Sequence, residues 1–442
     1  MSAGSTIVIT NNQNITFFSN PSITYFKSVY RKHTKFSITY KEETADKDFG
    51  DNNTEIPIEL NFDADLLCDI SLKVSVNNNG NDVICRLPND ISLFLIDNIK
   101  IDMRGKLNDF DILSKDYINF QAMLDNPKSL NSTYSFDSST GEVTCNSGNN
   151  YQNMALCGGV QRRNNVDHAT IKKMNAIIPL PFAFSKSIGN AIPLCALDMR
   201  NIKPTIVITG NNPTTTNTEN KFIIIESGSS EPLDQSTSDF DESNNKLRKL
   251  FKYSTITKYV FLSDDEKNRL TNSKLEYLYE RVDLLNNDTG IFFSNTTQTN
   301  DKININNLNN NVSIKKMYLY NKLNVGNFNK LQYKIFINNQ PLFTEFFNHE
   351  FFSKIEVLNK YKGCIYNGSN TGNVLIDNNI AMIDFSLKDS EGPTGSISSI
   401  TNTIDLNINP IDDDDDTYNI KIFICSYYVL TINNGEIRYV FN

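Results

Sequence analysis

The chain has 442 residues, too many for one ordinary domain and enough for two of about 200 residues each. Lys and Arg number 42 against 51 for Asp and Glu, and the formal net charge of −9 argues against a protein whose main task is to coat nucleic acid. No apolar run is long enough to cross a membrane as a helix, and the start of the chain lacks the basic region of a secretory signal, so we expect neither.

Short runs rich in Ile, Val, Phe, Tyr and Thr recur from end to end, with Asn-rich turns between them. Such runs predict β-strands, and the 64 Asn residues suit the turns. Helical periodicity is scarce: we expect one helix near residues 115–124 and another opened by a capping box formed by Ser263 and Glu266. The pattern is typical of all-β sandwiches or barrels. In chain order, the clearest expected strands are residues 36–40, 68–76, 94–102, 205–209, 314–320, 333–337, 381–387 and 427–432.

The composition changes near the middle of the chain. Residues 210–246 are polar and rich in Pro, Gly and Ser, and only residues 222–225 among them predict a strand. About 190 residues of strand pattern remain on each side, which is enough for an eight-stranded jelly roll with generous loops. The expected organisation is an N-terminal arm at 1–20, a first jelly roll at 21–210, a linker with one strand at 211–245 and a second jelly roll at 246–442.

The sequence lacks clusters of residues that carry chemistry. His33, His168 and His349 stand far apart, and neither a Gly-x-Ser-x-Gly elbow nor a glycine-rich phosphate loop occurs. The aspartates at 412–416 lack the spaced ligands and the turn glycine of a calcium loop, so we interpret them as a solvated hairpin loop. We therefore expect no catalytic residue, no cofactor, no metal site and no enzyme activity.

Neither the cysteines nor the glycosylation sequons indicate a special function. No Cys-x-x-Cys pair occurs, and most cysteines lie in apolar, strand-like settings, so we expect free, buried thiols made in a reducing cytoplasm. Cys145 and Cys157 share a loop-like region and are the pair to test for a bridge. Seven Asn-x-Ser/Thr sequons are no more than this many Asn residues give by chance, which leaves glycosylation open. The cysteines are Cys68, Cys85, Cys145, Cys157, Cys195, Cys364 and Cys425.

Residues 21–41 are basic in an acidic chain, with five Lys or Arg and no Asp or Glu. One interpretation is a solvated loop before the first strand. The other is a patch that meets an acidic partner surface or anionic lipid head groups. The candidate interface residues are Phe26, Lys27, Tyr30, Arg31, Lys32 and Lys35.

Residues 21–37 closely resemble the N-terminal signature of the double jelly-roll major capsid proteins of nucleocytoplasmic large DNA viruses. The family often has Trp after its Pro-Phe pair, where this chain has Ala183, and Asn-Phe-Ser-Arg where residues 397–400 read Ile-Ser-Ser-Ile. These departures suggest a divergent branch or a minor paralogue rather than another fold. Further segments resemble the family in the same order along the chain: residues 95–105, 178–194, 261–278, 392–399 and 428–435.

The resemblance implies an all-β fold of two consecutive eight-stranded jelly rolls, a double jelly roll with long loops and a few short helices. It implies a major capsid protein whose three chains form a pseudo-hexagonal homotrimer, the capsomer that tiles an icosahedral virion shell. The implied partners are neighbouring capsomers, minor capsid proteins beneath the shell and an internal membrane surface, with no direct nucleic acid contact. The chain would be synthesised in the host cytoplasm, and its basic N-terminal segment would lie at the capsomer base.

Three alternatives remain at this point. A minor capsid paralogue would share the fold and differ in its abundance in virions. A carbohydrate-binding β-sandwich would favour exposed Tyr and Trp platforms, and the absence of Trp counts against it. A jelly-roll enzyme would need clustered ligands or a catalytic arrangement, and the scattered His residues count against that.

Proline interrupts one apolar stretch of the first roll. Pro179, Pro181 and Pro193 lack the backbone donor of a sheet ladder, so a strand here lies at an edge or is broken. Gly189 and Asn190 supply a turn between the two apolar halves. We infer that such a broken strand lies at a seam where subunits meet.

Overall fold

The computed structural model describes most of the chain from residue 32 onward. It divides into two units, residues 1–35 and residues 36–442, and every strand of the described residues lies in the second. Among the described residues, no helix combines the length and the apolar character needed to cross a membrane. The described residues are 24, 26, 28, 32–49, 54–60, 64–77, 84–85, 89–104, 107–125, 132–146, 148–160, 169–198, 203–210, 224–225, 249–285, 291–294, 302–305, 313–321, 331–361, 380–387, 393–410 and 417–440.

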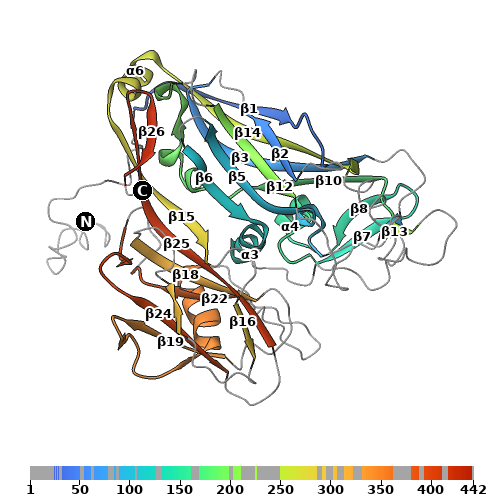
Figure 1. Cartoon of the computed structure of the whole chain (residues 1–442). Helices are drawn as coiled ribbons and strands as arrows, with labels where there is room; N and C mark the ends of the chain where they lie inside the picture. The colour runs from blue at the N-terminus through green and yellow to red at the C-terminus, as the bar shows by residue number, and fades with distance from the viewer. Residues whose placement is uncertain are drawn as a thin grey trace, which may run out of the picture. The chain divides into compact units, whose positions relative to one another are not determined.

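Two sheets and a small third one form the first roll (Figure 1). Side chains alternate between buried and partly exposed along β3, as expected for a strand with one face in a core. The larger sheet has the order β1 (Phe36–Thr44), β14 (Phe251–Leu262), β3 (Leu66–Asn77), β10 (Lys173–Pro179), β8 (Glu142–Asn146), β7 (Thr133–Asp137), with β11 (Ile192–Pro193) also on β3. The second has the order β2 (Glu55–Glu59), β12 (Lys203–Gly210), β5 (Ile96–Arg104), β6 (Leu107–Ser114), and the third β13 (Ile224–Ile225), β4 (Ile84–Cys85), β9 (Ala169–Thr170).

Two further sheets form the second roll around the long strand β25 (Thr417–Asn433). Most of the buried apolar side chains of both rolls belong to one continuous cluster. One sheet has the order β15 (Leu275–Leu284), β25, β18 (Ser313–Asn321), β22 (Ile380–Asp384), with β16 (Ile291–Ser294) and β26 (Glu436–Tyr439) on β25 and β23 (Ile397–Ser398) on β18. The other has the order β17 (Lys302–Asn304), β24 (Ile404–Pro410), β19 (Leu331–Ile337), β20 (Gln340–Pro341), with β21 (Phe347–Asn348) on β19.

Each expected strand overlaps a strand of the structure, and the all-β fold is confirmed; the strand expected at 381–387 ends at Asp384. Few helices are present in the described residues, as expected, and α3 (Lys115–Asp125) occupies the first expected position. The second expected helix forms as α6 (Asp264–Asn272), but its capping box does not, because the Ser263 side chain makes no capping hydrogen bond. Instead, the negative charges of the acidic residues in the first turn stabilise the helix, because they interact favourably with the partial positive charge at its N-terminal end. The remaining helices are η2 (Ile91–Leu93), α4 (Asn150–Ala155), η3 (Ala183–Lys186), η4 (Ile188–Asn190), η5 (Leu194–Ala196), the π-helix η8 (Phe351–Ile355) and α7 (Glu356–Lys360).

Strand β14 follows the expected linker in sequence but completes the larger sheet of the first roll. It pairs with β1 on one side and with β3 on the other, so it shields the edge of β3. The expected linker contributes β13 to the small sheet, and its other residues lie outside the described ones. The expected domain boundaries stay a prediction.

Candidate functional site

The interrupted strand of the first roll leads to the candidate site. Strands β10 and β11 both pair with β3, and the chain between them leaves the sheet as residues 180–191. The ladder of β10 ends at Pro179, and the turn at Gly189 and Asn190 lies in η4, as expected. We call residues 180–191 the excursion.

The excursion contacts the second roll of the same chain. The Tyr279 hydroxyl of β15 donates to the Asn190 carbonyl oxygen at 2.8 Å. The Lys186 ammonium lies 3.3 Å from a carboxylate oxygen of Glu280, also on β15. These contacts place the excursion at the junction between the two rolls of one chain. The expected position at a seam between subunits stays a prediction.

Polar contacts join the two rolls at three more points of this junction. Lys421 of β25 and Asp116 of α3 form a buried ion pair with Nζ and Oδ2 2.8 Å apart. The Tyr439 hydroxyl of β26 donates to the Phe110 carbonyl oxygen of β6 at 2.6 Å. The Asp198 amide donates to the Gly435 carbonyl oxygen at 3.0 Å. The first two contacts are buried, and buried polar groups paired in this way resist separation, because each would lose its partner.

Gly435 has a conformational reason to be glycine. It has φ of 81° in the turn between β25 and β26, where a side chain is disfavoured. An added Cβ would also lie 3.0 Å from the Asp198 side chain. The tight turn therefore lets the backbone of the second roll approach the first.

Aromatic rings fill the junction beneath these polar contacts. Phe120 of α3 lies 5.2 Å from the rings of Tyr318 and Phe423 and 5.6 Å from that of Tyr320, between ring centroids. Tyr117, one turn earlier on the helix, lies 5.2 Å from Phe120. Each such pair adds about 0.5–1.5 kcal/mol beyond the area it buries. Helix α3 therefore packs its aromatic side chains between the rolls.

A buried carboxyl group also lies at the junction. Asp111 of β6 accepts a hydrogen bond from the Ala183 amide of the excursion at 2.8 Å. Burial raises the pKa of Asp111 to about 6, and the Ala183 amide and Arg281 offset part of that effect. Arg281 of β15 is itself paired with Asp283, with 2.8 Å between Nε and Oδ1.

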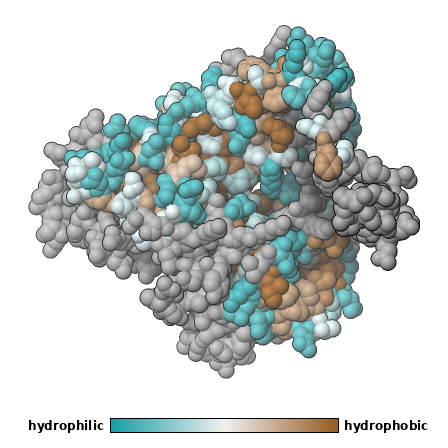
Figure 2. Space-filling view, turned by 180° about the vertical axis from the view of Figure 1, so that it is seen from behind, coloured by the Kyte–Doolittle hydropathy of each residue, from teal (hydrophilic) through white to brown (hydrophobic). Residues whose placement is uncertain are grey.

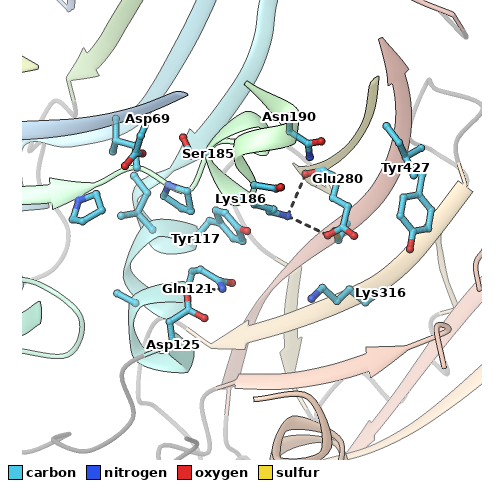
Figure 3. A pocket seen from close by; sticks show the side chains of 18 of the residues that line it. Asp69, Tyr117, Gln121, Asp125, Ser185, Lys186, Asn190, Glu280, Lys316 and Tyr427 are labelled. Atoms are coloured by element: carbon cyan, nitrogen blue, oxygen red, sulfur yellow. Dashed lines mark hydrogen bonds and ion pairs between the residues drawn. The ribbon is translucent and has the colours of Figure 1, made fainter. Parts of the chain in front are cut away.

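A cavity of about 1000 Å³, open on one side, lies at the junction between α3, the excursion, β15, β18 and β25. Figure 3 shows two groups of polar side chains around it, which we call the acidic wall (Asp69, Gln121, Asp125) and the basic wall (Lys186, Glu280, Lys316). Four carboxylates and two ammonium groups line the cavity in all, because Glu276 and Glu280 add to Asp69 and Asp125, against Lys186 and Lys316.

A β-bulge shapes the basic wall. Ile314 is opposite Ser426 of β25, and Lys316 is opposite the adjacent residue Cys425. Lys315 is therefore an extra residue in β18, with no partner position on β25. Nζ of Lys315 lies 2.5 Å from Oε1 of Glu280. Burial opposes the ionisation of Glu280, but Lys186, Lys315 and Lys316 together hold its pKa below the ordinary value.

An apolar strip crosses the outer face of β1, the edge strand of the larger sheet. Phe36, Ile38 and Tyr40 alternate along the strand and are 54%, 47% and 66% exposed. We call these three residues the β1 strip. Figure 2 shows that apolar side chains break the hydrophilic surface on the face it displays. Exposed apolar side chains on a strand at the edge of the described sheet are typical of a surface that meets another chain.

The candidate interface residues lie in the unit of residues 1–35. Phe26 is 99% exposed, and Lys32 and Lys35 are also exposed. Lys27, Tyr30 and Arg31 lie outside the described residues. The structure therefore leaves the proposed patch as a prediction.

The remaining residues singled out in the sequence can be placed in the structure or lie outside the part that it describes. Cys145 and Cys157 are free, as are Cys68, Cys195 and Cys425, so the bridge considered between the first two is not formed. His349 is buried and hydrogen-bonded to the Tyr333 hydroxyl at 2.8 Å. No group of three side chains able to hold a metal ion occurs among the described residues. Residues 412–416, His168, Cys364 and the seven sequon asparagines lie outside the described residues, and of Cys85 only the backbone, in β4, is described.

Sequence reasoning missed the junction residues. One signal was present, because Lys315 and Lys316 interrupt the otherwise apolar run at 314–320, and Lys421 interrupts the strand before Phe423. A charged residue in a strand buried on both faces needs a partner. The partners are distant in sequence, so the pattern alone does not identify them.

Comparisons with known proteins agree on one family. Residues 24–262 match the family described as the major capsid protein N-terminus, and this match ends at the last residue of β14. The major capsid protein of Paramecium bursaria Chlorella virus 1 is 23% identical over 303 residues, which make up 68% of this chain. The matched part spans 57% of that relative's length.

Solved structures agree in fold. The capsid structure of PBCV-1 has 17% identity and a TM-score of 0.62, covering 95% of this chain and 100% of that chain. The Faustovirus major capsid protein has 9% identity and a TM-score of 0.58, covering 93% of each chain. The likeness confirms the double jelly-roll fold.

Proposed function

This chain belongs to the major capsid protein family, and from that premise we propose that it forms the shell of a large double-stranded DNA virus. Three copies associate into a pseudo-hexagonal homotrimer, and these capsomers tile an icosahedral surface. A protein of this kind acts through burial and geometry. No catalytic residue or cofactor is part of the proposal.

The observation that carries the proposal is the junction between the two rolls. Each chain contributes two of the six corners of a trimer, so its rolls must keep one mutual arrangement. The ion pair of Asp116 with Lys421 and the aromatic packing of Phe120 support such an arrangement. A chain whose two rolls moved independently could not keep the fixed geometry that a trimer in a regular shell requires.

The β1 strip supports self-association. Its three apolar side chains are exposed on β1, which ends the order of the larger sheet among the described residues. An obligate trimer of this size buries about 2,000 Å² or more at each interface. Contacts between neighbouring capsomers are smaller, and the lattice multiplies their effect.

The basic N-terminal segment is proposed to face minor capsid proteins or an internal membrane surface. Its residues are Phe26, Lys27, Tyr30, Arg31, Lys32 and Lys35. The proposed location is the virion, after synthesis in the host cytoplasm.

Sedimentation of the purified chain tests the proposal. We expect a stable homotrimer at micromolar concentration. A monodisperse monomer under the same conditions would contradict it, since the proposed tile needs three chains.

A further inference from the structure

Asp111 lies where strand β6, the excursion and the second roll meet. It is 2% exposed, and the Ala183 amide of the excursion donates to its Oδ2 at 2.8 Å. The preceding residue, Phe110, contacts the second roll, because its ring lies 6.0 Å from that of Tyr279 on β15 and 5.8 Å from that of Tyr439 on β26, between centroids. These elements must therefore separate before water reaches the Asp111 carboxyl group.

No cation is in contact with this carboxyl group. Among the described residues Asp111 forms no ion pair, and its hydrogen bond comes from a neutral backbone amide. The guanidinium group of Arg281, which acts on Asp111 from β15, is already paired with Asp283 at 2.8 Å. Because a buried carboxylate that touches no cation is costly, the protonated form of Asp111 suits the closed junction better than the ionised form.

The other groups that act on Asp111 do not change charge near neutral pH. Nearby acidic groups outweigh burial and raise the pKa of the arginine and of the lysine among them, so both stay positive. Burial raises the pKa of the three tyrosines, so their hydroxyls stay neutral. The titratable groups that face Asp111 are Arg281, Asp283 and Tyr279 of β15, Lys186 of the excursion, Tyr439 of β26 and Tyr117 of α3.

We propose that the Asp111 carboxyl group is a proton-sensitive contact between the two rolls. When it is protonated, the excursion, β15 and β26 stay closed over β6. When it is ionised, their separation is favoured, because the open arrangement hydrates the carboxylate and moves it away from Asp283. The contact lies within one chain, so it does not rest on the proposed trimer.

The direction of the pH dependence follows from linkage. Burial raises the pKa of Asp111 in the closed form to about 6, whereas a hydrated aspartate has a pKa of about 3.9. The open arrangement therefore binds fewer protons, and its population rises with pH. From about pH 5 to about pH 7.5, these two pKa values increase the opening equilibrium constant about tenfold.

Two backbone amides report on this opening. The Ala183 N–H donates to Asp111 itself, and the Asp198 N–H donates to the Gly435 carbonyl oxygen across the junction. Protected amides exchange hydrogen with water when their part of the structure opens. The Leu60 N–H, which donates to the Pro204 carbonyl oxygen within the first roll, is the reference.

Hydrogen exchange of the full chain, resolved to single amides and corrected for the intrinsic effect of pH, tests the proposal. We expect Ala183 and Asp198 to be less protected than Leu60 and to lose protection about tenfold from about pH 5 to about pH 7.5. No loss of protection would overturn the proposal. Equal protection of all three amides at both pH values would also overturn it, since exchange would then require global unfolding. Sedimentation of the same samples reports separately on the proposed trimer.

Three variants make the test specific to this carboxyl group. Asp111→Asn keeps an acceptor oxygen but cannot ionise, so the pH-dependent loss of protection should disappear. Asp283→Asn keeps an oxygen for the Tyr428 hydroxyl and removes a negative neighbour of Asp111, so the loss should begin at lower pH. Asp137→Asn is the control, because Asp137 is exposed and outside the junction, and it should behave as wild type. A loss that persists in Asp111→Asn, or one that is unmoved in Asp283→Asn, would overturn the inference.

Discussion

Asp116 and Lys421 lie 305 residues apart in the chain and form a buried ion pair across the junction, with 2.8 Å between Oδ2 and Nζ. Their side chains are 10% and 7% exposed, so neither group has much access to water. The pair connects the helix of the first roll with the longest strand of the second. It is therefore a direct probe of how the two rolls are held together.

Removing one partner of this pair should be strongly destabilising. Asp116→Ala leaves the Lys421 ammonium buried without its carboxylate, and we expect a loss of about 3–5 kcal/mol in the free energy of unfolding. The double variant Asp116→Leu with Lys421→Met should recover most of that loss. Denaturant unfolding measures all three proteins.

The matched control for this pair is an exposed one. Lys173 and Glu142 lie 3.8 Å apart with 66% and 43% of their side chains exposed. Lys173→Ala should therefore change stability by about 0.2–1 kcal/mol. A loss as small as this in Asp116→Ala would show that the junction does not depend on the buried pair.

Asp111 should make stability depend on pH. Burial raises its folded pKa to about 6, above the ordinary unfolded value of about 3.9. The protonated form is favoured in the folded state, so the stability it contributes is complete below about pH 4 and is lost as the pH rises through about 6. The loss is on the order of 2–3 kcal/mol.

Asp111→Asn tests this directly, because the amide keeps an oxygen that accepts from the Ala183 N–H. We expect a higher Tm than wild type at about pH 7.5 and no gain at about pH 4. Asp137 is the control of opposite sign, since the Ser139 and Thr140 hydrogen bonds lower its pKa to about 2. Asp137→Asn should lower the Tm at about pH 7.5. Equal effects of Asp111→Asn at both pH values would contradict the assignment.

The thiols should be inert in the folded protein. Burial raises the pKa of Cys157 to about 12 and that of Cys68 to about 11, so almost no thiolate is present at neutral pH. A reductant should leave the Tm unchanged, and alkylation should be slow until urea unfolds the chain. A marked fall of Tm in reductant would require a disulfide and contradict the free state of Cys145 and Cys157.

Charge reversal in the basic N-terminal segment should impair particle assembly without affecting folding. Reversing Lys27, Arg31, Lys32 and Lys35 to Glu should leave folded trimers with normal Tm but impair particle assembly. Each exposed charge contributes only about 0.2–1 kcal/mol, and three copies at one trimer base act together. A normal particle yield from this variant would mean that the segment has no role at an interface. Unfolding of the trimer would mean that the segment stabilises the fold instead.

Local patterns predicted the strands, because alternation and turn residues act within a few positions. The interruption after Pro179 was predictable for the same reason, since the missing donor is a property of one residue. The bulge at Lys315 was not, because it depends on the register against β25, about a hundred residues later. The capping box at Ser263 failed although the helix formed, because the motif gives the residues but not the side-chain rotamer.

The junction was beyond sequence reasoning for a related physical reason. Asp116 on its helix and Lys421 on its strand each look like an isolated charge, and only the packing of the two rolls brings them together. The family resemblance implied two rolls in one chain, but not which side chains hold them. Those side chains follow from tertiary geometry.

Electron microscopy of the purified protein tests the central claim most directly. Averaged particle images should have threefold symmetry and a nearly hexagonal outline, with two lobes contributed by each chain. Isolated two-lobed particles, or rings of another symmetry, would contradict the account of the chain as one third of a capsid tile.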